Sequence, residues 1–159
     1  MRQTKRAFEW IVSILEKHKI PFQISGGLAA KIYGSPRKLA DIDIDIPKYK
    51  FIDIIAEVKD YIVWGPRRYK DKNWDVFLMT LKYANQKIDI SGGPVESIFD
   101  KKKRCWVNDR INFSNRDVKK IFGMFVPVIT KRELIDYKKK ISRTLDKIDI
   151  ESIKTRKSR

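Results

Sequence analysis

The segment ISGGLAAKIYGSPRKLADIDIDI, residues 24–46, joins a glycine pair, a basic turn and an alternating Asp/Ile run. In a strand successive side chains point to opposite faces, so Asp41, Asp43 and Asp45 share one face. Like charges so close raise one another's pKa unless a cation lies between them, and a divalent metal is the natural cation for carboxylates. The run therefore predicts a metal-binding strand. The alternative is a half-buried strand whose acidic face is solvated.

The glycine pair Gly26-Gly27 lies between an apolar segment, residues 22–24, and a helical pattern that begins at Leu28. Glycine lets a ligand approach the backbone closely, and the positive end of a helix attracts phosphate. A glycine pair alone is weak evidence, because glycines end many strands. Together with the acidic run in one short strand-helix-strand unit, it predicts a phosphate site beside the acidic strand.

Length and composition favour one globular domain. The chain has 159 residues, 42% of them hydrophobic, and we expect a domain over residues 1–150 followed by a basic, flexible tail at 151–159. No apolar run approaches a membrane span and the N-terminus lacks signal-peptide features, so we expect a cytoplasmic protein without a membrane partner. One cysteine and one histidine exclude an internal disulfide and the usual zinc clusters. A bound metal would have oxygen ligands, which favours Mg²⁺ or Mn²⁺.

The charge is strongly basic, with 36 Lys and Arg against 20 Asp and Glu and a formal net charge of +16. Such an excess attracts polyanions and indicates a nucleic acid or a phosphorylated substrate. The basic residues gather in two patches, Lys101–Arg104 and Lys138–Arg159, which predict where RNA would bind. The alternative is a Lys-rich composition that reflects genome base bias or a hot habitat.

Hydrophobic periodicity predicts the order of helices and strands. We expect helices near residues 5–17, 26–33 and 51–58, a short helix at 94–99, strands at 20–25, 41–46, 76–83 and 87–91, and irregular strands between 105 and 129. Thr130 with Glu133 three residues later predicts the start of one C-terminal helix. Strands and helices alternate early and hairpins follow, which predicts an α+β fold with a mixed central sheet and helices mainly on one face.

The order of these motifs resembles the nucleotidyltransferase superfamily of the polymerase-beta type: GG, then G-x-x-R-x-x-x-D-x-D, then a later strand with a single Asp between apolar residues. The matching positions are Gly26, Gly27, Gly34, Arg37, Asp41, Asp43 and Asp89. The C-terminal part is similar to the end of minimal nucleotidyltransferases, including the abortive-infection toxin group, at Leu134, Ile135, Lys138, Arg143, Asp146 and Asp149. The resemblance implies the mixed-sheet nucleotidyltransferase fold, while a toxin/antitoxin pair belongs to the non-catalytic alternative given below.

The resemblance also implies a chemistry, which is Mg²⁺- or Mn²⁺-dependent transfer of a nucleotide from an NTP such as ATP to a hydroxyl, an EC 2.7.7 reaction. Asp41 and Asp43 would hold the metal ions, while Asp89 would hold the metal beside the acceptor hydroxyl and help to deprotonate it. In the nucleotide-binding role, the backbone of Gly26-Gly27 would hold the phosphates and Arg37 would add charge.

Further positions follow from the same resemblance. Lys138 and Arg143, expected about one turn apart on the last helix, are predicted to cover the triphosphate, with a solvated helix face as the alternative. Asp45 is an extra carboxylate beyond the two metal ligands of the strand, and we expect its side chain to be solvated or to form a salt bridge to a Lys. Asp146 and Asp149 are expected to pair with the basic helix.

The acceptor predicted from the net charge is RNA, for example the acceptor end of a tRNA. Two alternatives stay open. One is nucleotidyl transfer to a small molecule such as an aminoglycoside or lincosamide antibiotic. The other is a non-catalytic module that binds RNA or a partner protein.

Overall fold

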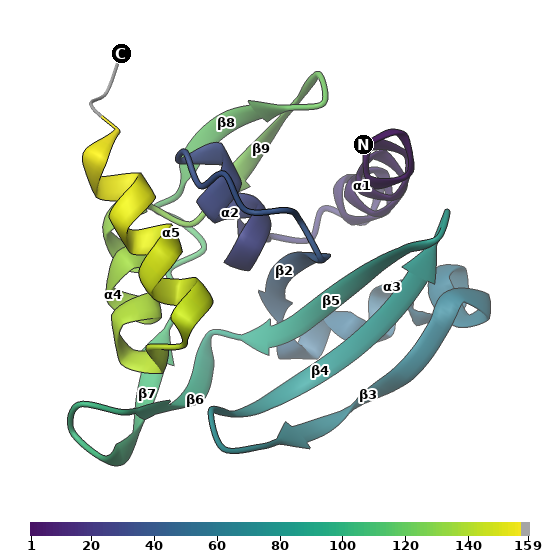
Figure 1. Cartoon of the computed structure of the whole chain (residues 1–159). Helices are drawn as coiled ribbons and strands as arrows, with labels where there is room; N and C mark the ends of the chain where they lie inside the picture. Colours follow the sequence, from purple (N-terminus) through teal and green to yellow (C-terminus); the bar gives the residue numbers. More distant parts are fainter. Residues whose placement is uncertain (157–159) are drawn as a thin grey trace.

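A computed structural model describes residues 1–156 of the chain (Figure 1). The strands are β1 (Gln23–Ser25), β2 (Asp41–Pro47), β3 (Ile62–Lys70), β4 (Trp74–Tyr83), β5 (Gln86–Gly93), β6 (Val95–Asp100), β7 (Cys105–Arg110), β8 (Asp117–Ile121) and β9 (Met124–Val128). The helices are α1 (Arg2–Lys17), α2 (Gly26–Ile32), α3 (Phe51–Val58), α4 (Lys131–Ile141) and α5 (Thr144–Thr155), with 3-10 turns η1 (Lys48–Lys50) and η2 (Lys59–Tyr61).

All nine strands form one mixed sheet in the order β7-β6-β4-β5-β2-β1-β9-β8, and β3 pairs with β4. The β2/β5 and β1/β9 pairs are parallel, and the other pairs are antiparallel. The predicted α+β class with a mixed central sheet is confirmed.

The Asp/Ile alternation of β2 separates the core from the site. Ile42, Ile44 and Ile46 are fully buried. On the same face of the sheet, α1 contributes buried apolar residues such as Phe8, and a Cβ at Gly92 of β5 would touch Phe51 of α3. Burying an Ile side chain contributes roughly 1.5–3 kcal/mol, so the three isoleucines fix the register of the strand. The aspartates are thereby turned to the opposite face.

The helices are divided between the two faces more evenly than predicted. Helices α1 and α3 cover the isoleucine face, while α2 packs on β1 and β2 at the aspartate face and contacts α4 and α5. None of the helices within residues 1–156 is long and apolar enough to cross a membrane.

Two local expectations are corrected. The segment 94–99, expected as a helix, contains strand β6. Its backbone pairs with β7 in a hairpin, and its side chains alternate so that Ile98 is buried. The single C-terminal helix is two helices, since Ser142 adopts a left-handed conformation with φ 54° and ends α4. The capping box of Thr130 and Glu133 at the start of α4 is present as predicted.

Residues 151–155 of the segment expected as a tail lie in helix α5. Helix α5 continues to Thr155, because Ile153 is fully buried and anchors its last turns. Residues 157–159 of the expected tail lie outside the described residues.

Candidate active site

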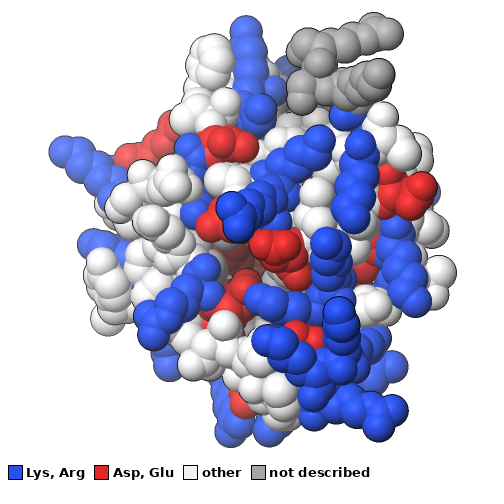
Figure 2. Space-filling view, turned by 90° about the vertical axis from the view of Figure 1, so that its left-hand side faces the viewer, with Lys and Arg blue, Asp and Glu red and all other residues white. Residues whose placement is uncertain are grey.

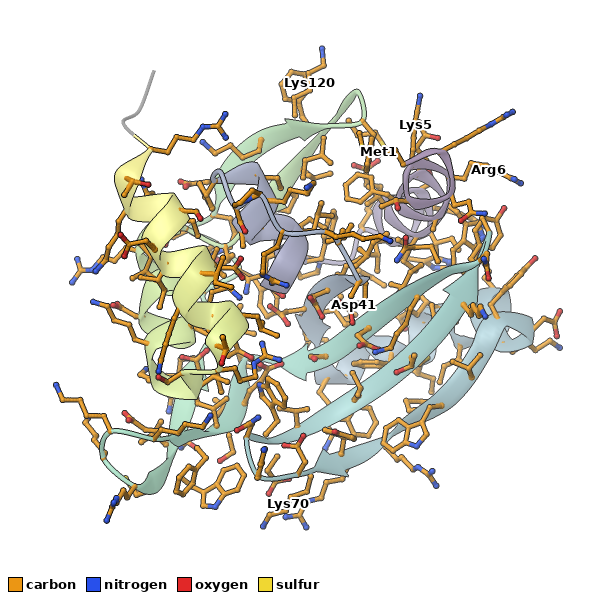
Figure 3. The ribbon with its side chains drawn as sticks, viewed as in Figure 1. Met1, Lys5, Arg6, Asp41, Lys70 and Lys120 are labelled. Atoms are coloured by element: carbon orange, nitrogen blue, oxygen red, sulfur yellow. The ribbon has the colours of Figure 1, made fainter. Side chains whose placement is uncertain are left out.

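The parallel pairing of β2 and β5 brings three carboxylates together. Asp43 lies opposite Asp89 in the register of the two strands, and Asp41 lies opposite Lys87. Asp41, Asp43 and Asp89 each place a carboxylate oxygen within 4.8 Å of the others, and all three side chains are partly buried. Asp41 lies at the start of β2, between α2 and β5 (Figure 3). We call these three residues the acidic triad.

The electrostatics of the acidic triad suit a bound cation. Burial, together with the charges of Asp41 and Asp89, raises the pKa of Asp43 to about 7, and the backbone N–H of Gly27 at 3.2 Å only partly opposes this. A divalent ion would lower that pKa, because it stabilises the ionised form. Clustered carboxylate oxygens with no sulfur or imidazole are the donors that Mg²⁺ and Mn²⁺ prefer, so the residues fit such an ion.

Lys87 and Thr80 donate hydrogen bonds to the acidic triad, and the sequence patterns did not identify them. The Lys87 ammonium donates to Asp89 at 2.6 Å and lies 3.4 Å from Asp41, while the Thr80 hydroxyl donates to Asp89 at 2.6 Å. The Lys87 side chain is 50% exposed, so it is free to swing into solvent when another cation binds. The signal for Lys87 was its position two residues before Asp89, which places both side chains on one face of β5.

Gly26 is required where β1 turns into α2. Its φ is +55°, and a Cβ at this position would overlap the carboxylate of Asp43. Only glycine therefore lets the backbone pass so close to the acidic triad. The N–H of Gly27, predicted to hold phosphate, donates to Asp43 at 3.2 Å, and the phosphate role of this pair stays a prediction.

The remaining predicted residues form a chain of ion pairs around α4 and α5. The Arg37 guanidinium donates to both oxygens of Asp149 at 2.7 and 2.8 Å. Lys138 lies 2.9 Å from Asp149 and 3.1 Å from Asp146. Arg143 donates in turn to both oxygens of Asp146, at 2.8 and 3.1 Å. We call these five residues the ion-pair chain, and the predicted pairing of Asp146 and Asp149 with basic residues is present in it.

The prediction that Lys138 covers the triphosphate stays a prediction. Its side chain is 1% exposed and borders the cavity, and its ammonium is held between two buried carboxylates. The residue also lies on α4, whereas Arg143 precedes α5. Arg143 remains a candidate contact for nucleotide, since its side chain is 33% exposed and its guanidinium lies 4.8 Å from the centre of the Trp74 ring.

Most of these groups line one cavity of about 600 Å³. Its lining includes the acidic triad, Gly26, Gly27, Arg37 and Arg143, together with Trp64, Trp74 and Tyr137. A space-filling view of the neighbouring face shows carboxylates near its centre with Lys and Arg side chains around them (Figure 2).

A second acidic group lines the same cavity and was not predicted as a site. It consists of Asp45, Glu96 and Asp109. Asp45 is 7% exposed and accepts a hydrogen bond of 2.6 Å from Gln23, so the expectation of a solvated or Lys-paired side chain is wrong. Burial keeps water away, and the register of β1 and β2 places Gln23 directly opposite Asp45.

The two predicted basic patches differ in how much of their charge is free. Lys101–Arg104 is an exposed turn between β6 and β7. In the Lys138–Arg159 patch, Lys138 and Arg143 are neutralised in the ion-pair chain and Lys140 lies 3.7 Å from Asp109. Other basic residues, such as Lys5, Lys70 and Lys120, point outward at the edges of the molecule (Figure 3).

No family model and no curated protein matches the sequence. Solved structures do match the fold. The candidate nucleotidyltransferase TM1012 from Thermotoga maritima has a TM-score of 0.71 at 18% identity, with 89% of this chain and 86% of that chain covered. The lincosamide antibiotic adenylyltransferase LnuA, with lincomycin bound, has a TM-score of 0.62 at 17% identity, with 94% and 96% covered.

The antibiotic-resistance factor ANT(2'')-Ia has a TM-score of 0.55 at 16% identity, with 94% of this chain and 80% of that chain covered. At such low identity these likenesses establish the fold, which is that of small nucleotidyltransferases. The activity has to be argued from the residues in the cavity.

Proposed function

We propose that the protein is a Mg²⁺- or Mn²⁺-dependent nucleotidyltransferase that moves a nucleoside monophosphate from an NTP to a hydroxyl group. The observation that carries the proposal is the convergence of Asp41, Asp43 and Asp89 within 4.8 Å on adjacent strands of a nucleotidyltransferase fold. A binding module for a polyanion has no use for three partly buried carboxylates in its cavity, because they repel its ligand.

The roles of the residues follow from where they lie. Asp41 and Asp43 would hold divalent metal, which stabilises the negative charge that develops on the phosphate oxygens during transfer. Asp89 would accept the proton of the attacking hydroxyl, since it borders the cavity and its carboxylate is oriented by Thr80. The guanidinium groups of Arg37 and Arg143 border the cavity at the side of α5 and would contact the phosphates in addition to their pairing with Asp149 and Asp146.

We further propose that the acceptor is RNA, which is supported by the net charge of +16 and by the exposed block Lys101–Arg104. A small-molecule acceptor is favoured by another observation, the acidic lining formed by Asp45, Glu96 and Asp109. LnuA, which is similar in fold, is a lincosamide adenylyltransferase, and this supports a small-molecule acceptor. A toxin/antitoxin role would bring a partner protein, and that stays a proposal.

A label-transfer assay tests the proposal. The protein is incubated with each α-labelled NTP, Mg²⁺ or Mn²⁺, and total RNA or a set of polyhydroxylated small molecules. We expect label to enter one acceptor class and the Asp41→Ala/Asp43→Ala variant to lose it. Tight RNA binding without label in any acceptor would overturn the proposal and support the non-catalytic alternative.

A further inference from the structure

The second acidic group of the cavity has no part in the transfer steps proposed above. Asp45 lies on β2, and Glu96 and Asp109 face each other directly across the β6/β7 pair. Like charges directly opposite in a sheet are destabilising. A costly arrangement of buried charge that borders a cavity is typical of a binding site.

Glu96 is the strongest sign of a missing ligand. Its side chain is 8% exposed, and Oε1 is fully buried without a hydrogen-bond partner among the described residues. Burial, with the charges of Asp45 and Asp109, raises its pKa well above the ordinary value. A buried acceptor that borders a cavity and lacks a donor is satisfied when a ligand brings the donor.

The protein's own cations do not fill this need. Lys140 lies 3.7 Å from Asp109, at the side of the group, and its ammonium is shared with no other carboxylate among the described ion pairs. Arg116 donates from its two terminal nitrogens to Gln23 and, at 2.7 Å, to Glu133. Its charge opposes the raised pKa of Asp45, but it makes no ion pair with Asp45, Glu96 or Asp109 among the described residues. Within residues 1–156 no Lys or Arg makes an ion pair with Glu96.

The spacing of the group selects the kind of cation. Among the described residues only the acidic triad brings three carboxylate oxygens within 4.8 Å of one another, so Asp45, Glu96 and Asp109 do not converge on one metal ion. A phosphate of a nucleic acid would be repelled by the same carboxylates. An amine binds carboxylates through N–H donors at about 2.7–2.9 Å, and a ligand with more than one amino group reaches carboxylates that do not converge on a single ion.

We propose that Asp45, Glu96 and Asp109 bind ammonium groups of the acceptor, so that the acceptor is a polyhydroxylated amine with more than one amino group. This inference rests on the proposed nucleotidyl transfer. Asp45 follows Asp43 by two residues on the same face of β2, a distance of about 7 Å along the strand. An amine that carries its hydroxyl one ring away therefore presents that hydroxyl to the acidic triad while its ammonium lies between Asp45 and Glu96.

A matched pair of ligands tests the binding step without any transfer. 2-Deoxystreptamine and myo-inositol are six-membered rings of similar size, but only the first carries amino groups. Ligand-observed NMR with the full chain and Mn²⁺-free buffer measures their affinities. We expect 2-deoxystreptamine to bind at least about tenfold more tightly than myo-inositol. Glu96→Gln and, separately, Asp109→Asn should abolish this preference, while Glu151→Gln, which removes a charge from the exposed face of α5, should keep it.

Transfer from a labelled NTP to the same two ligands separates this inference from the proposed function. Label that enters 2-deoxystreptamine in preference to myo-inositol, with the preference lost in Glu96→Gln, supports the inference. No preference for the amine in binding, while label enters RNA, overturns the inference and leaves the proposed function standing. Preference for the amine without label in any acceptor overturns the proposed function, and with it the role of this group in acceptor binding.

Discussion

The two sets of buried acids in this protein are compensated in opposite ways. In the ion-pair chain Asp146 and Asp149 are fully buried, and each meets two cationic side chains. In the acidic triad the ammonium of Lys87, whose side chain is half exposed, pairs with Asp41 and Asp89, and Asp43 has no ion pair among the described residues. Carboxylates that are paired with cations hold elements of the fold together, whereas carboxylates with too few cationic partners are typical of a ligand-binding site.

The same contrast shows in the direction of the pKa shifts. Hydrogen bonds from Arg37, Ser35 and Lys138 outweigh burial and lower the pKa of Asp149 to about 2. Burial and neighbouring carboxylates raise the pKa of Asp43 to about 7. Ionisation of Asp149 therefore stabilises the fold above about pH 4, and this contribution is lost as the pH falls towards 2. Ionisation of Asp43 costs stability as the pH rises from about 4 to 7.

The largest effect is expected from removing the acidic triad. Asp41→Ala/Asp43→Ala should lower nucleotidyl transfer at least about 10⁴-fold, or about 5.4 kcal/mol, because the phosphates lose their metal. A label-transfer assay measures the loss of activity, and a Mn²⁺ titration measures the loss of metal binding. Asp53→Ala/Asp60→Ala removes the same charge from exposed positions near α3 and serves as the control. Equal loss in both double variants would show that net charge, not the triad, supports the activity.

The second effect is on stability and contrasts the two regions directly. Asp149→Asn should lower the free energy of unfolding by about 3–5 kcal/mol at pH 7. Arg37 then has no carboxylate partner, and the buried Lys138 keeps only Asp146. Asp43→Asn, the same chemical change, should leave stability unchanged or raised in the absence of metal, since it removes a repelled charge. Urea unfolding of both variants checks the comparison. Similar losses would mean that the two acids are equally important to the fold.

The third effect isolates the close approach of Gly26 to the triad. Gly26→Ala should lower transfer about 100-fold, or about 2.7 kcal/mol, because the added methyl group displaces the Asp43 carboxylate. Gly123→Ala is the matched control: Gly123 also has a positive φ, +87°, but a Cβ there meets nothing within 4 Å. Both variants carry the strain of a left-handed alanine, so only the first should lose activity. Equal activity in the two would show that Asp43 can shift without loss.

How far the sequence led differs between the two regions. The acidic triad could be predicted, because strand alternation and one parallel pairing fix which side chains share a face. The ion-pair chain could not be placed, since whether Lys138 is buried depends on the break at Ser142, which turns α5 back against α4. Glu96 was missed for a similar reason, because residues 94–99 fit a short helix in isolation. Their pairing with β7 in a hairpin and, across a longer stretch of chain, with β4 makes them a strand that places Glu96 at the cavity.

The smallest effect is a pH dependence that has opposite consequences in the two regions. Metal binds the ionised form of Asp43, so Mn²⁺ affinity measured by calorimetry should rise about fivefold between pH 6 and pH 7 and about twofold more before it levels off near pH 8. Asp149→Asn, compared at a temperature where it stays folded, should keep this dependence, because Asp149 is already ionised throughout the range. Asp43→Asn should remove it. A flat profile in the unmodified protein would mean that Asp43 is already ionised at pH 6, and the acidic triad would then resemble the ion-pair chain, whose carboxylates are compensated.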